Sequence, residues 1–158
     1  MRNTRGVPLT FPARPYCSFC GFMQGRWAWE PIDDGELAVS FVNRRQRSRG
    51  SVLVAPRRHV EALDQLGPAE VRAFGALVHR TAASLERALR PDGLHLWWGA
   101  GELAGQSEPH LHAQLVPRYA EVAYSFAPSL DLDVADRGER LDLARALRDT
   151  GTQPPEDN

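Results

Sequence analysis

The chain has 158 residues, a length that fits one domain with a buried core of its own. Its formal net charge is −1 and its pI about 6.5, so no overall basic field indicates a nucleic-acid partner or a membrane surface. All 19 basic residues are arginine, which excludes a Walker-type lysine, a Schiff-base lysine and a pyridoxal enzyme.

The N-terminal segment is expected to be an irregular arm over residues 1–15, because prolines flank the run that leads into Cys17 and Cys20. It carries arginines but no apolar core of a signal peptide, and no stretch approaches the roughly 18 apolar residues of a membrane span. We therefore expect a cytoplasmic protein with no membrane partner. The C-x-x-C spacing is better suited to a metal or redox pair than to a long-loop disulfide.

Alternating or β-branched runs predict four strands, over residues 36–43, 51–56, 94–99 and 110–117. A polar turn, NRRQRSRG, separates the first two. Apolar residues recur at helical spacing between Pro68 and Pro91, which predicts one long helix. A second helix is expected over residues 139–149.

The order strand, strand, helix, strand, strand predicts an α+β fold, with a mostly antiparallel sheet and a helix on one face. We expect a single domain over residues 16–130, followed by a C-terminal extension over 131–158 whose tail is disordered.

Two thiolates and a choice of imidazoles could form a tetrahedral zinc site. The chain offers five histidines, at positions 59, 79, 95, 110 and 112. His79 falls inside the long helix and His95 inside a strand, where ordinary structural histidines are common. His59 follows a strand that ends at Pro56, in a loop where ligands gather. Free thiols are the alternative interpretation.

The run SEPHLHAQLVPR places His110, His112 and Gln114 at every second position, so that they share one face of a strand. The opposite face is apolar. An amphipathic surface strand would explain the alternation without any chemistry. A neutral imidazole is also a competent nucleophile toward an α-phosphorus, provided that its other nitrogen donates a hydrogen bond. A pure binding row stays open as well.

The loop GAGELAGQSEP has glycines at 99, 101 and 105, which miss the G-x-G-x-x-G spacing of dinucleotide-binding proteins. Its backbone amides and its small polar residues, Gln106 and Ser107, could approach phosphate oxygens closely. An ordinary connection between antiparallel strands would also explain the glycines.

These motifs together resemble the histidine triad (HIT) superfamily of nucleotide hydrolases and transferases. GQSEPHLHAQLVPR is similar to the family signature, ELAVSFVNRR and GSVLVAPRRHVEALDQLGPAEV resemble its nucleoside-binding strands and helix entry, and CSFC resembles its zinc-binding members. The resemblance spans roughly residues 16–118. It implies an antiparallel sheet packed by a long helix, a homodimer and a nucleotide substrate. From the net charge we expect no nucleic-acid partner.

Carried over by position, the resemblance implies that a structural zinc is bound by Cys17, Cys20, His59 and His110. His112 then becomes the nucleophile that takes up the nucleotidyl group. Asn43 corresponds to a ribose-binding residue, and Gln106 with Ser107 to a turn that contacts phosphate.

The chain also departs from the family pattern. Gln114 replaces the third histidine, which resembles the branch of galactose-1-phosphate uridylyltransferase and the dinucleoside polyphosphate phosphorylases. Glutamine cannot titrate, so transfer to an acceptor should suffer less than direct hydrolysis. Ser51 stands where the family has histidine, and Gly99 where it has a polar residue. The alternatives are a plain HIT hydrolase and a nucleotide-binding protein with little turnover. We expect Trp97 and Trp98 to fill the core rather than to stack on a base.

Overall fold

The computed structural model describes residues 17–121 and 135–151 of the chain. These residues form three α-helices and a five-stranded antiparallel sheet, with short 3-10 turns η1 (Leu63–Gln65) and η2 (Glu102–Ala104). The strands are β1 (Pro31–Asp34), β2 (Ala38–Val42), β3 (Val52–Pro56), β4 (Gly93–Trp97) and β5 (Ala113–Arg118). The helices are α1 (Ser18–Met23), α2 (Pro68–Leu89) and α3 (Arg137–Gly151).

The spatial order of the strands is β1-β2-β3-β5-β4, so β5, the last strand among the described residues, lies between β3 and β4. Every pairing is antiparallel. Because strand side chains alternate between the two faces, these registers decide which residues meet on each side of the sheet.

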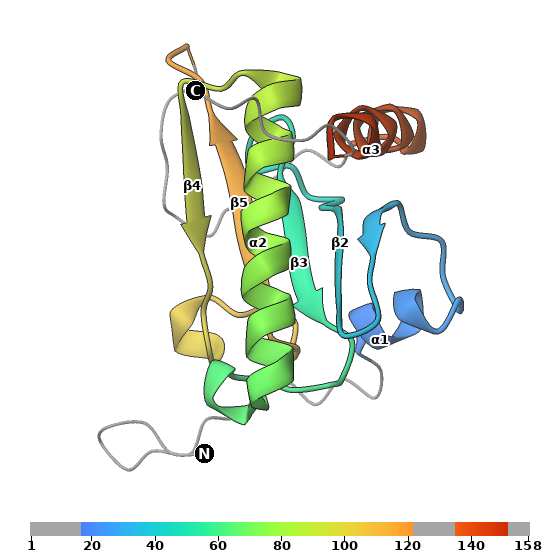
Figure 1. The fold of residues 1–158 in the computed structure, drawn as a ribbon, viewed down its shortest axis with the longest axis vertical. Coiled ribbons are helices and arrows are strands. Elements are labelled where there is room, and N and C mark those ends of the chain that lie inside the picture. Colours follow the sequence, from blue (N-terminus) through green and yellow to red (C-terminus); the bar gives the residue numbers. More distant parts are fainter. Residues whose placement is uncertain (1–16, 122–134, 152–158) are drawn as a thin grey trace.

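One face of the sheet carries the main hydrophobic core. Helix α2 lies lengthwise over β2, β3 and β5 (Figure 1). Its side chains Phe74, Leu77 and Leu85 pack against Val54 and Leu115 of the sheet. Pro68 stands at the first position of α2, where its missing N–H costs nothing.

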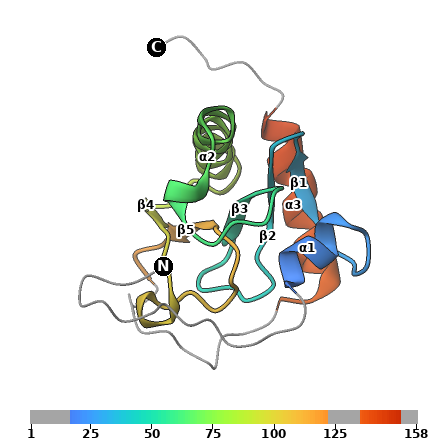
Figure 2. The ribbon, with the colours of Figure 1, turned by 90° about the horizontal axis from the view of Figure 1, so that it is seen from below.

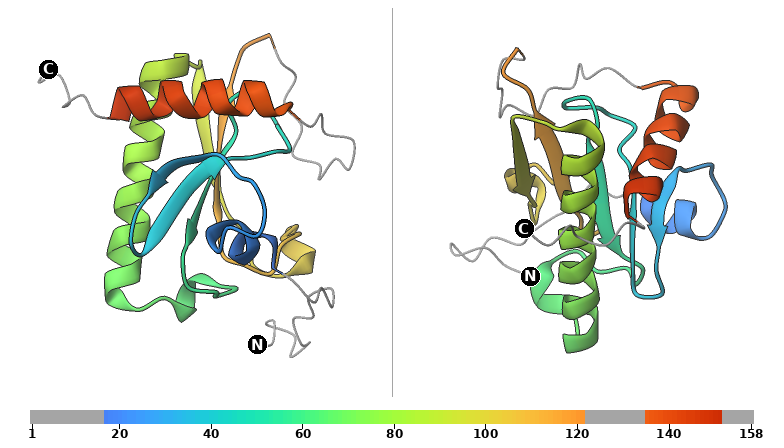
Figure 3. Two further views of the ribbon diagram at one scale, coloured as in Figure 1. Left: turned by 90° about the vertical axis from the view of Figure 1, so that its right-hand side faces the viewer. Right: turned by 45° about the horizontal axis from the view of Figure 1, so that its top comes forward.

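Helix α3 completes that face and runs crosswise to α2 (Figure 3, left). Leu147 of α3 is fully buried in the same core. The buried carboxylate of Glu30 accepts two hydrogen bonds from the guanidinium of Arg140, at 2.9 and 3.2 Å. The two partners compensate for each other's lost hydration, and either left alone would be an unpaired buried charge.

The opposite face carries a second, smaller cluster. Phe19 of α1 packs there with Val39 and Phe41 of β2 and with Leu53 and Ala55 of β3. Figure 2 shows α1 and α2 on different sides of the sheet. The second face also holds the side chains that could bind a metal or take part in a reaction.

Most of the expected elements are present. The mixed architecture, the antiparallel sheet and both long helices are confirmed. The strand predicted over 110–117 begins only at Ala113, and Pro117 lies inside it rather than ending it. Pro117 is tolerated because β3 pairs only as far as Leu115, so β5 has a partner on one side only there.

Two elements were not expected from the sequence, α1 and β1. The arm at 1–15, the boundary at 130–131 and the tail after 151 lie outside the described residues. Among the described residues, no helix is both long enough and apolar enough to span a membrane.

Candidate active site and metal site

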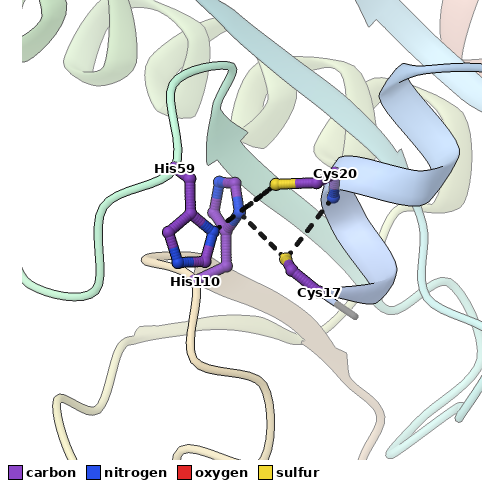
Figure 4. Close-up of side chains that lie close together, drawn as sticks. All are labelled: Cys17, Cys20, His59 and His110. Atoms are coloured by element: carbon purple, nitrogen blue, oxygen red, sulfur yellow. Dashed lines mark hydrogen bonds between the residues drawn. The ribbon is translucent and has the colours of Figure 1, made fainter. Parts of the chain in front are cut away.

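Two cysteines and two histidines lie close together on the second face of the sheet, beside the end of β3 (Figure 4). The ligand atoms of Cys17, Cys20, His59 and His110 all lie within 4.8 Å of one another. Cys17 Sγ is 3.3 Å from His110 Nδ1, and Cys20 Sγ is 3.4 Å from His59 Nδ1 and 3.7 Å from His110 Nδ1. Bond lengths of about 2.3 Å for Zn–S and 2.0 Å for Zn–N place neighbouring tetrahedral ligands roughly 3.6 Å apart. The donor set and its spacing therefore fit a tetrahedral metal site.

His110 is oriented for ligation by its other ring nitrogen. Nε2 donates to the carbonyl oxygen of Pro56 at 2.8 Å, so the lone pair is on Nδ1, which faces the sulfurs. Such a carbonyl partner is the usual device for fixing the tautomer of a metal-binding histidine. Burial of the ring lowers the pKa of His110 to about 4, so the imidazole is neutral at pH 7.

Helix α1 brings the cysteines to the cluster. Cys17 is its N-cap, and its Sγ accepts from the Cys20 N–H at 3.4 Å. Ser18 Oγ donates to Glu108 at 2.9 Å, which ties α1 to the loop that carries His110. Burial raises the pKa of the Cys17 thiol to about 11. A bound cation would reverse that preference, because a coordinating thiol is deprotonated.

The loop after β3 holds His59, the one exposed member of the cluster. Arg58 binds both carboxylate oxygens of Glu70, at 2.8 and 2.7 Å, and Glu70 accepts from the Gly67 N–H at the start of α2. Gln106 Nε2 donates to the carbonyl of Glu61 at 3.0 Å. The His59 loop is thus fastened on both sides.

His112 lies next to the cluster and is 6% exposed. Its Nδ1–H donates to the carbonyl oxygen of His110 at 2.8 Å, which leaves the lone pair on Nε2. The Gln114 amide nitrogen is 3.5 Å from that Nε2, and the ring of Phe19 meets His112 edge-on. Burial lowers the pKa of His112 and favours the neutral form. The hydrogen bond that His112 donates to the His110 carbonyl and the negative charge of Glu108 act in the opposite direction.

The expected histidine row is therefore buried rather than exposed. His110, His112 and Gln114 are 0%, 6% and 8% exposed, so the interpretation as an amphipathic surface strand is wrong. Both histidines precede the first residue of β5. The row lies on the inner surface of a site and not on a solvated sheet.

A scan against protein families matches residues 32–121, more than half of the chain, to the HIT domain. The chain belongs to the HIT family.

Relatives of the HIT domain agree with that match. The chain is 29% identical over 121 residues to an uncharacterized HIT-like protein of Methanocaldococcus jannaschii, a match that covers 74% of this chain and 93% of the relative. It is 31% identical over 83 residues to the bis(5′-nucleosyl)-tetraphosphatase of Schizosaccharomyces pombe, covering 52% of this chain and 46% of that protein.

Solved HIT structures share the fold. A Zn-bound histidine triad family protein from Mycobacterium smegmatis aligns with a TM-score of 0.71 at 27% identity, covering 85% of this chain and 92% of the other. A hypothetical histidine triad nucleotide-binding protein from Sulfolobus tokodaii aligns with a TM-score of 0.76 at 20% identity, covering 85% of this chain and 91% of the other.

The substrate-binding residues expected from the HIT resemblance are partly engaged within the protein. Asn43 Oδ1 accepts from the Arg45 N–H at 3.0 Å. Gln106 is buried, and besides its bond to Glu61 it accepts from the Gly101 N–H at 2.7 Å. Both ends of the Gln106 amide are thus used to fold the glycine loop, whereas Ser107 is exposed.

The departures from the HIT pattern have structural reasons. A Cβ at Gly99 would lie 2.4 Å from the carbonyl oxygen of Ala104, so the loop has no room for a side chain there. Ser51 Oγ donates to the Ser48 carbonyl at 2.7 Å and accepts from the Ser48 N–H, which closes the turn between β2 and β3.

The expectation that both tryptophans fill the core is wrong. Trp98 is 52% exposed and Trp97 is half-buried. The guanidinium carbon of Arg47 lies 5.2 Å from the centre of the Trp97 ring. Trp97 pairs directly with Gln114, Gln114 with Leu53 and Leu53 with Phe41, so these four side chains form one row across the second face.

The sequence interpretation missed three contributors to the site: Phe19, Glu108 and Arg47. Phe19 contacts the rings of both His110 and His112. No sequence signal links Phe19 or Glu108 to the histidines. Arg47 did have a signal, the unusual arginine content of the turn NRRQRSRG.

Proposed function

We propose that this HIT protein transfers or hydrolyses a nucleoside monophosphate group through a covalent intermediate on Nε2 of His112. The observation that carries the proposal is the bond from His112 Nδ1–H to the His110 carbonyl. That bond directs the lone pair of a neutral, buried imidazole to Nε2. A covalent route splits one difficult displacement at phosphorus into two easier ones.

In the first half-reaction, the Nε2 lone pair forms a bond to the α-phosphorus while the bond from phosphorus to the leaving-group oxygen breaks. The leaving oxygen keeps the electron pair of that bond. The imidazole then carries positive charge, which the carbonyl acceptor at Nδ1–H stabilises. In the second half-reaction, an acceptor oxygen bonds to phosphorus and the N–P bond breaks.

Gln114 favours an acceptor that arrives already ionised. Its amide donates to Nε2 in the resting site but can neither take up nor release a proton. Water as acceptor must lose a proton, whereas a phosphate dianion need not. This supports transfer of the kind performed by the uridylyltransferase and phosphorylase branch of the superfamily.

We assign the residues that would hold a zinc ion as Cys17, Cys20, His59 and His110. The donor set and its spacing support that assignment, and a HIT neighbour of 27% identity is described as Zn-bound. When bound, zinc supplies rigidity rather than a reacting group. The ion would fix the ring of His110 and, with it, the backbone carbonyl of His110 that orients His112.

The test is covalent labelling. The purified protein is incubated with a panel of α-labelled nucleotides and examined by intact mass and peptide mapping. The expected result is one nucleotidyl group on His112, discharged by added phosphate or sugar phosphate.

His112→Ala should lose the adduct while nucleotide affinity stays nearly unchanged. His79→Ala, at an exposed position of α2, is the control and should keep the adduct. An adduct that persists in His112→Ala would contradict the proposal. Reversible binding without any adduct would favour a nucleotide-binding protein.

A second candidate is a hydrolase, in which water discharges the same intermediate. The relative from S. pombe, 31% identical over 83 residues, is named a tetraphosphatase, which favours it. Release of nucleoside monophosphate at the same rate with and without acceptors would support this candidate.

A further inference from the structure

The turn between β2 and β3 concentrates positive charge in a chain of net charge −1. Four arginines, at 44, 45, 47 and 49, fall within six residues of it. Among the residues that the structure describes, no carboxylate pairs with any of the four, whereas Arg57, Arg58, Arg80 and Arg140 each have an acidic partner. The turn therefore presents basic side chains that the described part of the chain does not neutralise.

The turn is held in one conformation by its own side chains. Gln46 Oε1 accepts from the N–H groups of Gly50 and Ser51, at 2.8 and 2.9 Å, and Gln46 Nε2 donates to the Ser51 carbonyl. Ser51 in turn bonds Ser48. Such a turn fixes the direction in which Arg47 leaves the backbone.

Arg47 reaches from this turn to Trp97 of β4, although β5 lies between β3 and β4. Trp97 is the direct partner of Gln114, whose amide contacts His112 Nε2. Arg47 is half-buried, and burial lowers the pKa of its guanidinium, which nevertheless stays charged. A partly desolvated cation is thus held one strand away from the reacting nitrogen.

A guanidinium that lies over an aromatic ring still has an N–H edge that can bind a ligand. That edge matches two oxygens of a phosphate, which makes arginine the preferred residue for bidentate phosphate recognition. The alternative is that Arg47 only covers Trp97 through a cation–π contact and binds no ligand.

In-line displacement places the leaving group on the side of the phosphorus opposite to Nε2, and the acceptor later enters from that same side. The ring of His112 contacts Phe19 edge-on, and its Nε2 lies 3.5 Å from the amide nitrogen of Gln114, from which the row continues to Trp97 of β4. A leaving group directed along that row meets Arg47.

Resting on the proposed function, we infer that Arg47, supported by Trp97, binds the phosphate attached to the α-phosphorus. The substrate class is then nucleotides with a phosphoanhydride at that position, and the acceptor is inorganic phosphate or a phosphate ester. In the first step the P–O–P bridge breaks as the N–P bond forms, and Arg47 holds the departing phosphate. In the second, a phosphate oxygen displaces Nε2.

The experiment compares two substrates that share a nucleoside and differ in leaving group: diadenosine tetraphosphate and adenosine 5′-phosphoramidate. Arg47→Ala should lower kcat/KM for the tetraphosphate roughly 10- to 100-fold, the worth of a charge-assisted hydrogen bond, and for the phosphoramidate by less than about threefold. Discharge of the His112 adduct by inorganic phosphate should slow in Arg47→Ala, while discharge by water stays unchanged.

Two further variants sharpen the comparison. Arg45→Ala removes the same charge from the same turn at an exposed position and should leave both substrates unaffected. Arg47→Lys keeps the charge but not the fork, and should recover only part of the tetraphosphate activity.

Equal losses on both substrates, or no loss on either, would overturn the assignment of Arg47. An equal effect of Arg45→Ala would instead attribute phosphate binding to the combined positive charge of the turn. Failure of the unaltered protein to form an adduct with either substrate would instead overturn the proposed function itself.

Discussion

At the scale of single residues, we propose that Gln114 controls what the covalent intermediate on His112 reacts with. A histidine in its place would supply a titratable group beside Nε2 of His112, where the Gln114 amide nitrogen now lies at 3.5 Å. General acid or base groups typically contribute about 100- to 10,000-fold. We expect Gln114→His to raise the ratio of hydrolysed to transferred product, measured by chromatography with phosphate present. An unchanged ratio would mean that Gln114 does not control the outcome.

Gly99 is fixed by its surroundings rather than by the substrate. A methyl group at this position would meet the Ala104 carbonyl at 2.4 Å, and backbone cannot yield easily. Gly99→Ala should lower the free energy of unfolding by about 1–3 kcal/mol, the usual cost of overpacking. Urea unfolding of the parent and the variant measures this difference in the free energy of unfolding.

Gly75 in α2 is the matched control for Gly99, because nothing lies within 4 Å of its added Cβ. Gly75→Ala should stabilise by about 0.5–1 kcal/mol through helix propensity. Equal effects of the two substitutions would contradict this account of the loop.

At the scale of elements, we expect the stability of α1 to depend on the proposed metal site. The helix has only six residues, too few to be stable alone, and it bears both cysteines. We expect one zinc per chain by elemental analysis, and a sharp fall in Tm on chelation, because structural zinc binding in finger peptides is worth about 10 kcal/mol or more.

Replacement of His59 should lower the zinc content, whereas His79→Ala should keep it. A protein without zinc, whose Cys17 and Cys20 are freely alkylated, would refute the metal site.

The start of α2 should respond to acid. Arg58 and the Gly67 N–H hold the pKa of Glu70 at about 2, below its ordinary 4.5. The unfolded state then binds more protons than the folded one between these values, so the contribution of Glu70 is complete above pH 4.5 and disappears as the pH falls toward 2.

The difference in unfolding free energy between the parent and Glu70→Gln should shrink over that interval. Urea titrations at several pH values test it, with the exposed Glu86→Gln as the flat control. A difference that does not change with pH would show that the charge of Glu70 has no role.

Sequence patterns predicted these elements unequally. The 22-residue α2 has a long apolar period between two prolines, so its limits were readable. Helix α1 has no period to detect, because its position is set by Cys17 as cap and by Glu108 from a segment 90 residues away. The contact of Arg47 with Trp97 required the order β3-β5-β4, which local patterns do not reveal. The loop position of His59 after Pro56 marked it as a candidate ligand, and the family resemblance then combined it with His110.

At the scale of the whole molecule, the sheet has two edges, β1 and β4. Helix α3 lies against β1, while β4 carries the exposed Leu96 and is followed by the exposed Trp98. Uncovered edges invite pairing, and a two-fold homodimer would satisfy one with a single self-complementary patch. Light scattering at micromolar concentration should return the mass of two chains. The mass of one chain would contradict the expected homodimer.

The site depends on the register of the strands, because its row of side chains comes from four different strands: Phe41, Leu53, Gln114 and Trp97. A slip of β5 by one residue would exchange its two faces, bringing Leu115 toward His112 and driving the Gln114 amide into the core beneath α2. An unpaired amide buried there would cost about 1–3 kcal/mol. The polar residues that we propose for the chemistry would thus also penalise misaligned strand pairings. A deletion of one residue within β5 should therefore abolish folding and activity together, whereas a deletion in an exposed loop need not.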